Sequence, residues 1–87
     1  MQYWTGVDYA GYDTRFVENV STLEDCMDLC IEDVACNAIA FEPNDSHVCW
    51  IKHDAGDYYI KSITTSALKC NFVPKVKHAL PDGIYTL

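Results

Sequence analysis

Residues 26–36 read CMDLCIEDVAC and place three cysteines within eleven positions. The first two cysteines are four residues apart, and five residues separate the second from the third. This spacing is compatible with a metal site, a redox centre, or the disulfide framework of a small extracellular domain. The choice among these three decides most of what the sequence predicts about function.

The length and cysteine content of the chain favour a secreted domain. A chain of 87 residues forms one domain with a limited core, and five cysteines are typical of an oxidising compartment. No apolar run could span a bilayer and residues 1–11 lack a signal-peptide pattern, so we expect a module of a longer protein. Asn19 and Asn44 begin Asn-x-Ser acceptor sequences for glycosylation, which fits passage through the secretory pathway.

The charge of the chain limits the partners that it can bind. It carries thirteen acidic and six basic residues, a formal net charge of −7. Such a surface repels the phosphates of nucleic acids and the sulfates of heparin-like glycans. We therefore expect a neutral or basic partner, with no binding to nucleic acid and no direct insertion into a membrane.

The clearest secondary-structure element is a helix over residues 22–34. Ser21 and Glu24 have the spacing of a capping box, in which each side chain bonds to the backbone of the other residue. Apolar residues then recur every three or four positions, which predicts one buried face that includes both helix cysteines. This face comprises Leu23, Cys26, Met27, Cys30, Ile31 and Val34.

Short strand patterns surround the helix, and turn signals separate them. The strand patterns cover residues 15–18, 37–41, 47–52 and 58–61. One helix among hairpin-linked strands predicts a small α+β domain over residues 1–70, with a central helix packed on an antiparallel sheet. Residues 71–87 contain two prolines and no clear period, which predicts a C-terminal linker or an edge extension of the sheet.

Metal and redox sites fit the cysteine spacing less well than disulfides do. A zinc site would combine Cys26, Cys30 and Cys36 with a histidine, but paired ligands of structural zinc sites usually stand two to four residues apart at a turn. A redox centre would need two cysteines separated by two residues, a pattern that the sequence lacks. By contrast, Cys30 can reach Cys36 beyond the helix end, and Cys26 can reach the strand that holds Cys49. Disulfides are therefore favoured, and no metal or cofactor is expected.

Three segments together resemble the PAN/apple domain family. They are TLEDCMDLCIEDVACNAIAFEP (22–43), CWIK (49–52) and TTSALKC (64–70), and the resemblance covers residues 6–70. It implies a helix packed on an antiparallel sheet, with disulfides that join Cys26 to Cys49 and Cys30 to Cys36. Many apple domains have a further disulfide between the first and last strands. Cys70 fits its C-terminal member, but residues 1–4 contain no cysteine, so Cys70 is expected to be unpaired or to bond outside the domain.

The same resemblance implies an extracellular adhesive module of a larger multidomain protein. Its expected partners are a protein or glycan on a cell surface and neighbouring modules of its own chain. The acidic charge favours the apple domains of apicomplexan microneme adhesins, which attach to host cells, over heparin-binding apple domains. An assembly or dimerisation module and the accessory domain of a secreted protease are the alternatives. No enzymatic activity is expected, because the histidines have no nucleophile in a recognisable arrangement.

The acidic side of the predicted helix is one candidate ligand-binding surface. Glu24, Asp28 and Glu32 follow one another at intervals of four, and each such like-charge pair destabilises an isolated helix by about 0.2–0.5 kcal/mol. A helix that tolerates this repulsion is suited to a basic partner, although charged runs of this kind more often form a solvated face.

The turn between the strand patterns 47–52 and 58–61, together with the residues that flank it, is the second candidate. It offers the ligand-binding residues Lys52, Asp54, Asp57, Tyr58 and Tyr59. One of two consecutive tyrosines in a strand points outward, where its ring can stack on a sugar while carboxylates accept hydrogen bonds from the sugar hydroxyls. Trp50 is predicted to face away from the disulfide of Cys49 and to be another surface aromatic. For each ring, packing within the sheet is the alternative.

Overall fold

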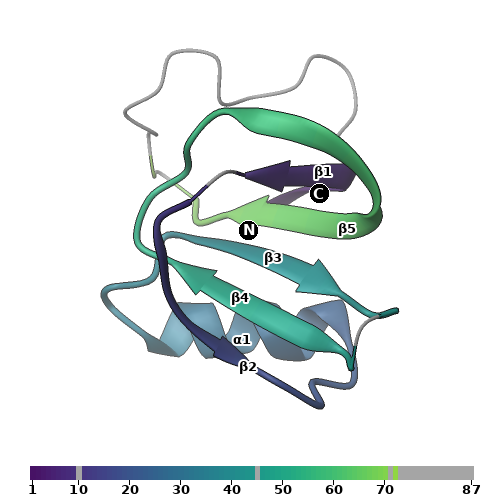
Figure 1. Ribbon diagram of the computed structural model, residues 1–87. Coiled ribbons are helices and arrows are strands. Elements are labelled where there is room, and N and C mark those ends of the chain that lie inside the picture. The colour runs from purple at the N-terminus through teal and green to yellow at the C-terminus, as the bar shows by residue number, and fades with distance from the viewer. Residues whose placement is uncertain (10, 45, 71, 73–87) are drawn as a thin grey trace.

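The computed structural model describes residues 1–9, 11–44, 46–70 and 72, which form one helix and five strands (Figure 1). The elements are β1 (Gln2–Tyr9), β2 (Asp13–Val17), α1 (Leu23–Glu32), β3 (Ala38–Glu42), β4 (Val48–Lys52) and β5 (Tyr58–Leu68). The strands form one antiparallel sheet in the order β1-β5-β3-β4-β2, and α1 packs on one face of it. The predicted α+β class is confirmed. Except for Phe72, the segment 71–87 lies outside the described residues, so its role as a linker or edge extension stays a prediction.

The start of α1 differs by one residue from the predicted cap. Thr22, not Ser21, is the N-cap residue, and its hydroxyl oxygen accepts a 3.1 Å hydrogen bond from the backbone N–H of Asp25. Thr22 has the extended backbone that an N-cap requires, so either hydroxyl residue fits the sequence pattern and the backbone decides between them. The predicted capping box between Ser21 and Glu24 is therefore wrong.

The buried face of α1 is shorter than its periodicity predicts. Cys26 and Cys30 are fully buried, whereas Ile31 is 58% exposed and Val34 is 94% exposed. The prediction is wrong for Ile31 and Val34. The helix ends at Glu32, so Val34 no longer follows the helical period, and Ile31 lies about 100° around the helix from Cys30. Leu29 instead packs against the core together with the predicted residues of the first turns.

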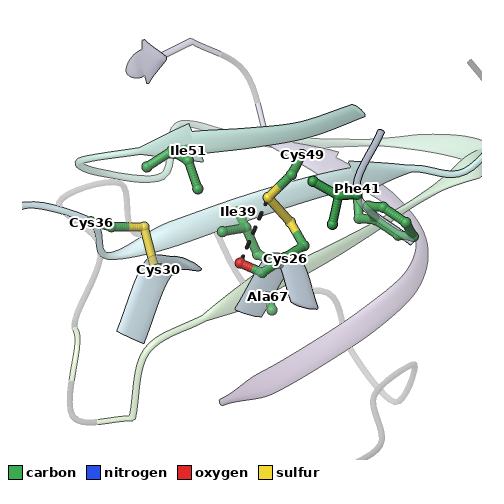
Figure 2. Close-up of a cluster of buried hydrophobic side chains, with 9 residues drawn as sticks. Cys26, Cys30, Cys36, Ile39, Phe41, Cys49, Ile51 and Ala67 are labelled. Atoms are coloured by element: carbon green, nitrogen blue, oxygen red, sulfur yellow. Dashed lines mark hydrogen bonds between the residues drawn. A yellow bond between two sulfur atoms is a disulfide. The ribbon is translucent and has the colours of Figure 1, made fainter. Parts of the chain in front are cut away.

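One disulfide ties α1 to a strand of the sheet, and a second ties it to the segment just before β3 (Figure 2). Cys26 bonds to Cys49 of β4 with an S–S distance of 2.02 Å, and Cys30 bonds to Cys36, just before β3, with an S–S distance of 2.08 Å. These are the pairs that the resemblance implies. Apolar side chains of three strands surround the bonds and complete the core between helix and sheet. They are Ile39, Phe41, Ile51 and Ala67.

A second apolar cluster holds β1 against β5 and the start of β3. It consists of Trp4, Val7, Tyr9, Ala38, Ala55 and Leu68. β1 was not predicted from the sequence, because Gly6 and Asp8 interrupt the alternation of residues 2–9. Within the described ranges, no helix combines the length and apolarity needed to cross a membrane.

Candidate functional site

A groove of about 340 Å³ opens on the sheet face that points away from α1. In β4, Cys49 and Ile51 contact the core below α1, so the alternate residues Trp50 and Lys52 face the groove. Its volume is at the lower end of the range for small-ligand sites. The lining residues are Asp8, Tyr9, Gly11, Asp13, Glu42, Trp50, Lys52, Tyr59 and Lys61.

An irregularity in the β1–β5 ladder shapes one wall of the groove. Residues 61–64 of β5 bulge opposite the single residue Gly6 of β1. Gly6 has φ +74°, a left-handed conformation that glycine adopts without steric cost. The bulge brings the side chains of Lys61 and Thr64 to the same carboxylate oxygen of Glu42 on β3.

A second irregularity shapes the opposite wall, in the β2–β4 ladder. Asp13 pairs with Lys52 and Phe16 pairs with Trp50, but the register shifts between Asp13 and Arg15. A regular strand would place residues three positions apart on opposite faces. The bulge instead leaves Asp13 and Phe16 on the groove side. Arg15 Nη2 lies 3.7 Å from Asp33 Oδ2, at the C-terminal end of α1.

Glu42 is a buried carboxylate in the lining of the groove. Its Oε2 lies 2.5 Å from the Lys61 ammonium and accepts a 2.9 Å hydrogen bond from the Thr64 hydroxyl, and its Oε1 accepts a 3.1 Å bond from the Trp50 indole N–H. Burial alone would raise the pKa of Glu42, but the hydrogen bonds from Lys61, Thr64 and Trp50 together hold this pKa below its ordinary value. The carboxylate therefore stays ionised and fixes three side chains around it.

Lys61 and Tyr59 present polar groups at the mouth of the groove. The Tyr59 hydroxyl donates a 2.8 Å hydrogen bond to Asp8 Oδ2, and Lys61 Nζ lies 3.9 Å from the same oxygen. The hydrogen bond to Glu42 raises the pKa of Lys61, and the hydrogen bond to Asp8 raises the pKa of Tyr59. At neutral pH the ammonium is therefore charged and the phenol protonated. Tyr59 remains exposed, and Lys61 partly so.

Lys52 lies under the groove and positions Asp13. Its ammonium is buried and donates hydrogen bonds of 2.6 Å to Asp13 Oδ1 and 3.0 Å to the carbonyl oxygen of Gly11. The Asp13 side chain, by contrast, remains exposed to solvent. Lys52 thus serves as an internal support, and the carboxylate of Asp13 is the group that a ligand can reach from this wall.

Two buried polar atoms on the floor of the groove have no hydrogen-bond partner among the described residues. They are the hydroxyl of Tyr9 and Oδ1 of Asp8. Burial raises the pKa of Tyr9, so its hydroxyl stays protonated. A buried polar group without a partner destabilises a fold by roughly 1–3 kcal/mol, so these two atoms lower the stability of the domain.

The other predicted residues of the turn lie outside the groove. Asp54 is buried, and its carboxylate accepts a 2.8 Å hydrogen bond from the backbone N–H of Ala55. Tyr58 packs against the cluster that holds β1, and Asp57 is exposed and is not among the lining residues. Of the five predicted residues, the structure brings Lys52 and Tyr59 to the site.

None of the three carboxylates that line the groove was predicted from the sequence. Asp8, Asp13 and Glu42 belong to β1, β2 and β3, and no local pattern links residues that meet only through strand pairing. The alternation that turns Cys49 toward the core does signal the outward position of Trp50, which the sequence analysis identified as a surface aromatic.

The remaining predicted residues lie on other parts of the surface. Glu24, Asp28 and Glu32 are exposed on α1, on the side of the sheet away from the groove. Asn19 and Asn44 are exposed, and Cys70 is exposed and outside both disulfides. Among the described residues, no group of three or more His, Cys, Asp or Glu could hold a metal ion.

Comparison with known proteins connects this architecture to a family. A family model described as "PAN domain" matches residues 5–52. This stretch is more than half of the chain and contains both disulfides, α1, and the strands β2, β3 and β4. No curated protein matches the chain.

Proposed function

Because the chain belongs to the PAN domain family, whose members bind proteins or carbohydrates, we propose that it is an adhesive module of a larger extracellular protein. We propose further that its groove holds a carbohydrate. The observation that carries this proposal is the set of groups around Glu42, where the exposed ring of Tyr59 and the half-buried ring of Trp50 stand beside a fixed ammonium and fixed carboxylates.

The exposed chemistry of the groove matches the two needs of a sugar ring. The C–H face of a sugar packs against the negative face of an aromatic ring, and Tyr59 and Trp50 supply such rings. Sugar hydroxyls need donors and acceptors, and Lys61 supplies N–H groups while Asp13 supplies carboxylate oxygen. Because internal hydrogen bonds already orient these groups, little conformational entropy is lost when a ligand binds.

The charge balance of the groove favours a neutral ligand. Its two ammonium groups are paired internally, Lys61 with Glu42 and Lys52 with Asp13. The third carboxylate, Asp8, adds one negative charge in a chain of net charge −7. A sulfated or phosphorylated glycan would meet a repulsive field, so a neutral sugar is the better fit.

The extracellular setting is supported by the disulfide framework and the family. Two disulfides in a small domain persist in an oxidising compartment, and PAN domains generally act there as binding modules. The cysteine spacing, the acidic charge and the resemblance described above support a role in attachment to host cells, within an array of neighbouring modules, as in microneme adhesins.

A glycan array tests the carbohydrate proposal. The purified domain is applied to neutral mono-, di- and trisaccharides that end in galactose, glucose, mannose or N-acetylglucosamine, and affinities for the positive sugars are measured by titration calorimetry. Tyr59→Ala should weaken binding about tenfold, because it removes one aromatic contact and leaves the core intact. Ile60→Ala is the matched control, since Ile60 is an exposed neighbour whose side chain points away from the groove. Equal affinity in both variants would contradict the proposal.

Assembly through an intermolecular disulfide is the second candidate function. It rests on one observation: Cys70 is exposed and free, while the other four cysteines are paired. Non-reducing mass spectrometry tests it directly, because a Cys70–Cys70 dimer would be lost in Cys70→Ser. A monomer that contains one reactive thiol would argue against assembly.

A further inference from the structure

The groove does not include all of the aromatic surface on its side of the sheet. Phe16 of β2 is 54% exposed and lies beside Trp50, with their ring centroids 5.1 Å apart and their planes inclined at 42°. Trp50 of β4 lines the groove, whereas its neighbour Phe16 on the adjacent strand β2 is not among the lining residues. The aromatic surface therefore continues from the groove toward the β2 edge of the sheet.

We propose that the ligand is an oligosaccharide of at least two sugar rings, and that Phe16 forms a second ring-binding position next to Trp50. This inference rests on the proposed carbohydrate function, because it assigns the class of ligand that the same groove accepts. The first ring would occupy the groove between Tyr59 and Trp50, and the second would lie over Phe16.

The exposure of Phe16 has no evident structural purpose. It does not belong to either apolar cluster, and β2 is an edge strand of the sheet. An exposed phenylalanine on an edge strand promotes unwanted association, so proteins usually place charged residues there. The bulge between Asp13 and Arg15 turns this ring to the groove side, where it extends the binding surface.

Trp50 gives the second position a fixed geometry. The indole N–H bonds to Glu42 Oε1 at 3.1 Å, so its ring cannot turn freely, and Phe16 packs against a stationary neighbour. A rigid pair of rings loses little conformational entropy when a sugar stacks on it. Two adjacent rings, one inside the groove and one outside it, match the repeating rings of an oligosaccharide.

A second aromatic pair near the groove fits this role less well. Tyr12 and His53 meet edge to face, with ring centroids 5.4 Å apart and planes at 87°. Neither residue lines the groove. The Phe16–Trp50 pair, in contrast, shares a member with the lining, so a ligand that leaves the groove past Trp50 reaches Phe16 directly.

The test is the dependence of affinity on glycan length. Titration calorimetry on the neutral mono-, di- and trisaccharide series gives the ratio of trisaccharide to monosaccharide affinity. In the unmodified domain this ratio should be about ten, the upper end of what one aromatic contact contributes. Phe16→Ala should reduce the ratio to near one, whereas Phe16→Tyr keeps the ring and should keep the ratio. Ile31→Ala, at a similarly exposed apolar residue on α1, should also leave the ratio unchanged.

The possible failures are distinguishable. A ratio near one in the unmodified domain, or a ratio that Phe16→Ala does not change, would overturn the inference while monosaccharide binding still supports the proposed function. An absence of binding to every sugar in the series would overturn both. Circular dichroism checks that Phe16→Ala is folded, which we expect because this ring is exposed.

Discussion

The Lys61 ammonium lies 2.5 Å from Glu42 Oε2, although Lys61 belongs to the bulged part of β5 and Glu42 to the end of β3. This contact joins a mostly buried carboxylate to a partly exposed cation. It therefore couples the stability of the sheet to the groups that a ligand would meet.

The first prediction concerns the pH dependence of Glu42. Its pKa is lowered in the folded state, so its stabilising contribution is fully present above the unfolded-state pKa and is lost as the pH falls through the folded-state pKa. Glu42→Gln should lower the free energy of unfolding at neutral pH by about 1–3 kcal/mol, because Lys61 loses its partner. Urea unfolding between about pH 3 and pH 7 should show a smaller loss of stability in acid for the variant. Parallel pH curves would contradict this role of Glu42.

The second prediction ranks the two disulfides. Their sequence separations are 23 residues for Cys26–Cys49 and 6 residues for Cys30–Cys36. In the chain-entropy model the longer loop contributes about 3.4 kcal/mol and the shorter about 2.2 kcal/mol. Replacing both cysteines of a pair by alanine should therefore lower stability more for Cys26–Cys49, as measured by chemical denaturation. Equal losses would indicate that loop closure does not set their contributions.

The helix and its disulfides could be predicted because their signals are local. Cys26, Cys30 and Cys36 lie within eleven residues, and the apolar period around the first two marks the buried face of the helix. The strand that holds Cys49 is within reach of Cys26, and the resemblance implies the same pair. The errors at Ser21, Ile31 and Val34 fall at the helix ends or on its margin, where the sequence pattern does not define the backbone.

The groove could not be predicted because its residues meet through strand register. Asp8, Glu42 and Lys61 come from three strands, and their contact depends on the bulge opposite Gly6. A lone glycine in a polar segment signals a turn as readily as a bulge. Because β1 was not predicted from this segment, Asp8 was not among the site residues predicted from the sequence.

The third prediction tests the role of Gly6. An added Cβ would have Cα of Ser62 as its nearest neighbour at 4.0 Å, so space does not limit substitution. The backbone conformation limits it instead: at φ +74° an alanine would adopt a left-handed conformation, which costs about 1–2 kcal/mol. Gly6→Ala should lower the free energy of unfolding by this amount, and Gly6→Asn by less, since asparagine tolerates that conformation better. Thermal unfolding measures both, and an equal loss would show that the backbone conformation is not the cause.

The fourth prediction separates the two tryptophans by their exposure. Trp4 is 2% exposed within the cluster that holds β1, whereas Trp50 is half-buried and lines the groove. Acrylamide should therefore quench the fluorescence of Trp4→Phe, in which Trp50 remains, more strongly than that of Trp50→Phe. A glycan bound in the groove should reduce quenching in Trp4→Phe and leave Trp50→Phe unchanged.

This fluorescence measurement also reports on the site independently of affinity. Trp4 lies in the second apolar cluster and does not line the groove. In Trp50→Phe it is the remaining tryptophan, so its fluorescence serves as the reference that a ligand in the groove does not change. If a sugar binds by calorimetry but protects neither tryptophan, the ligand occupies another surface, and the exposed acidic side of α1 becomes the next candidate. Protection confined to Trp50 would instead locate the ligand against the wall that Glu42 holds in place through the indole N–H.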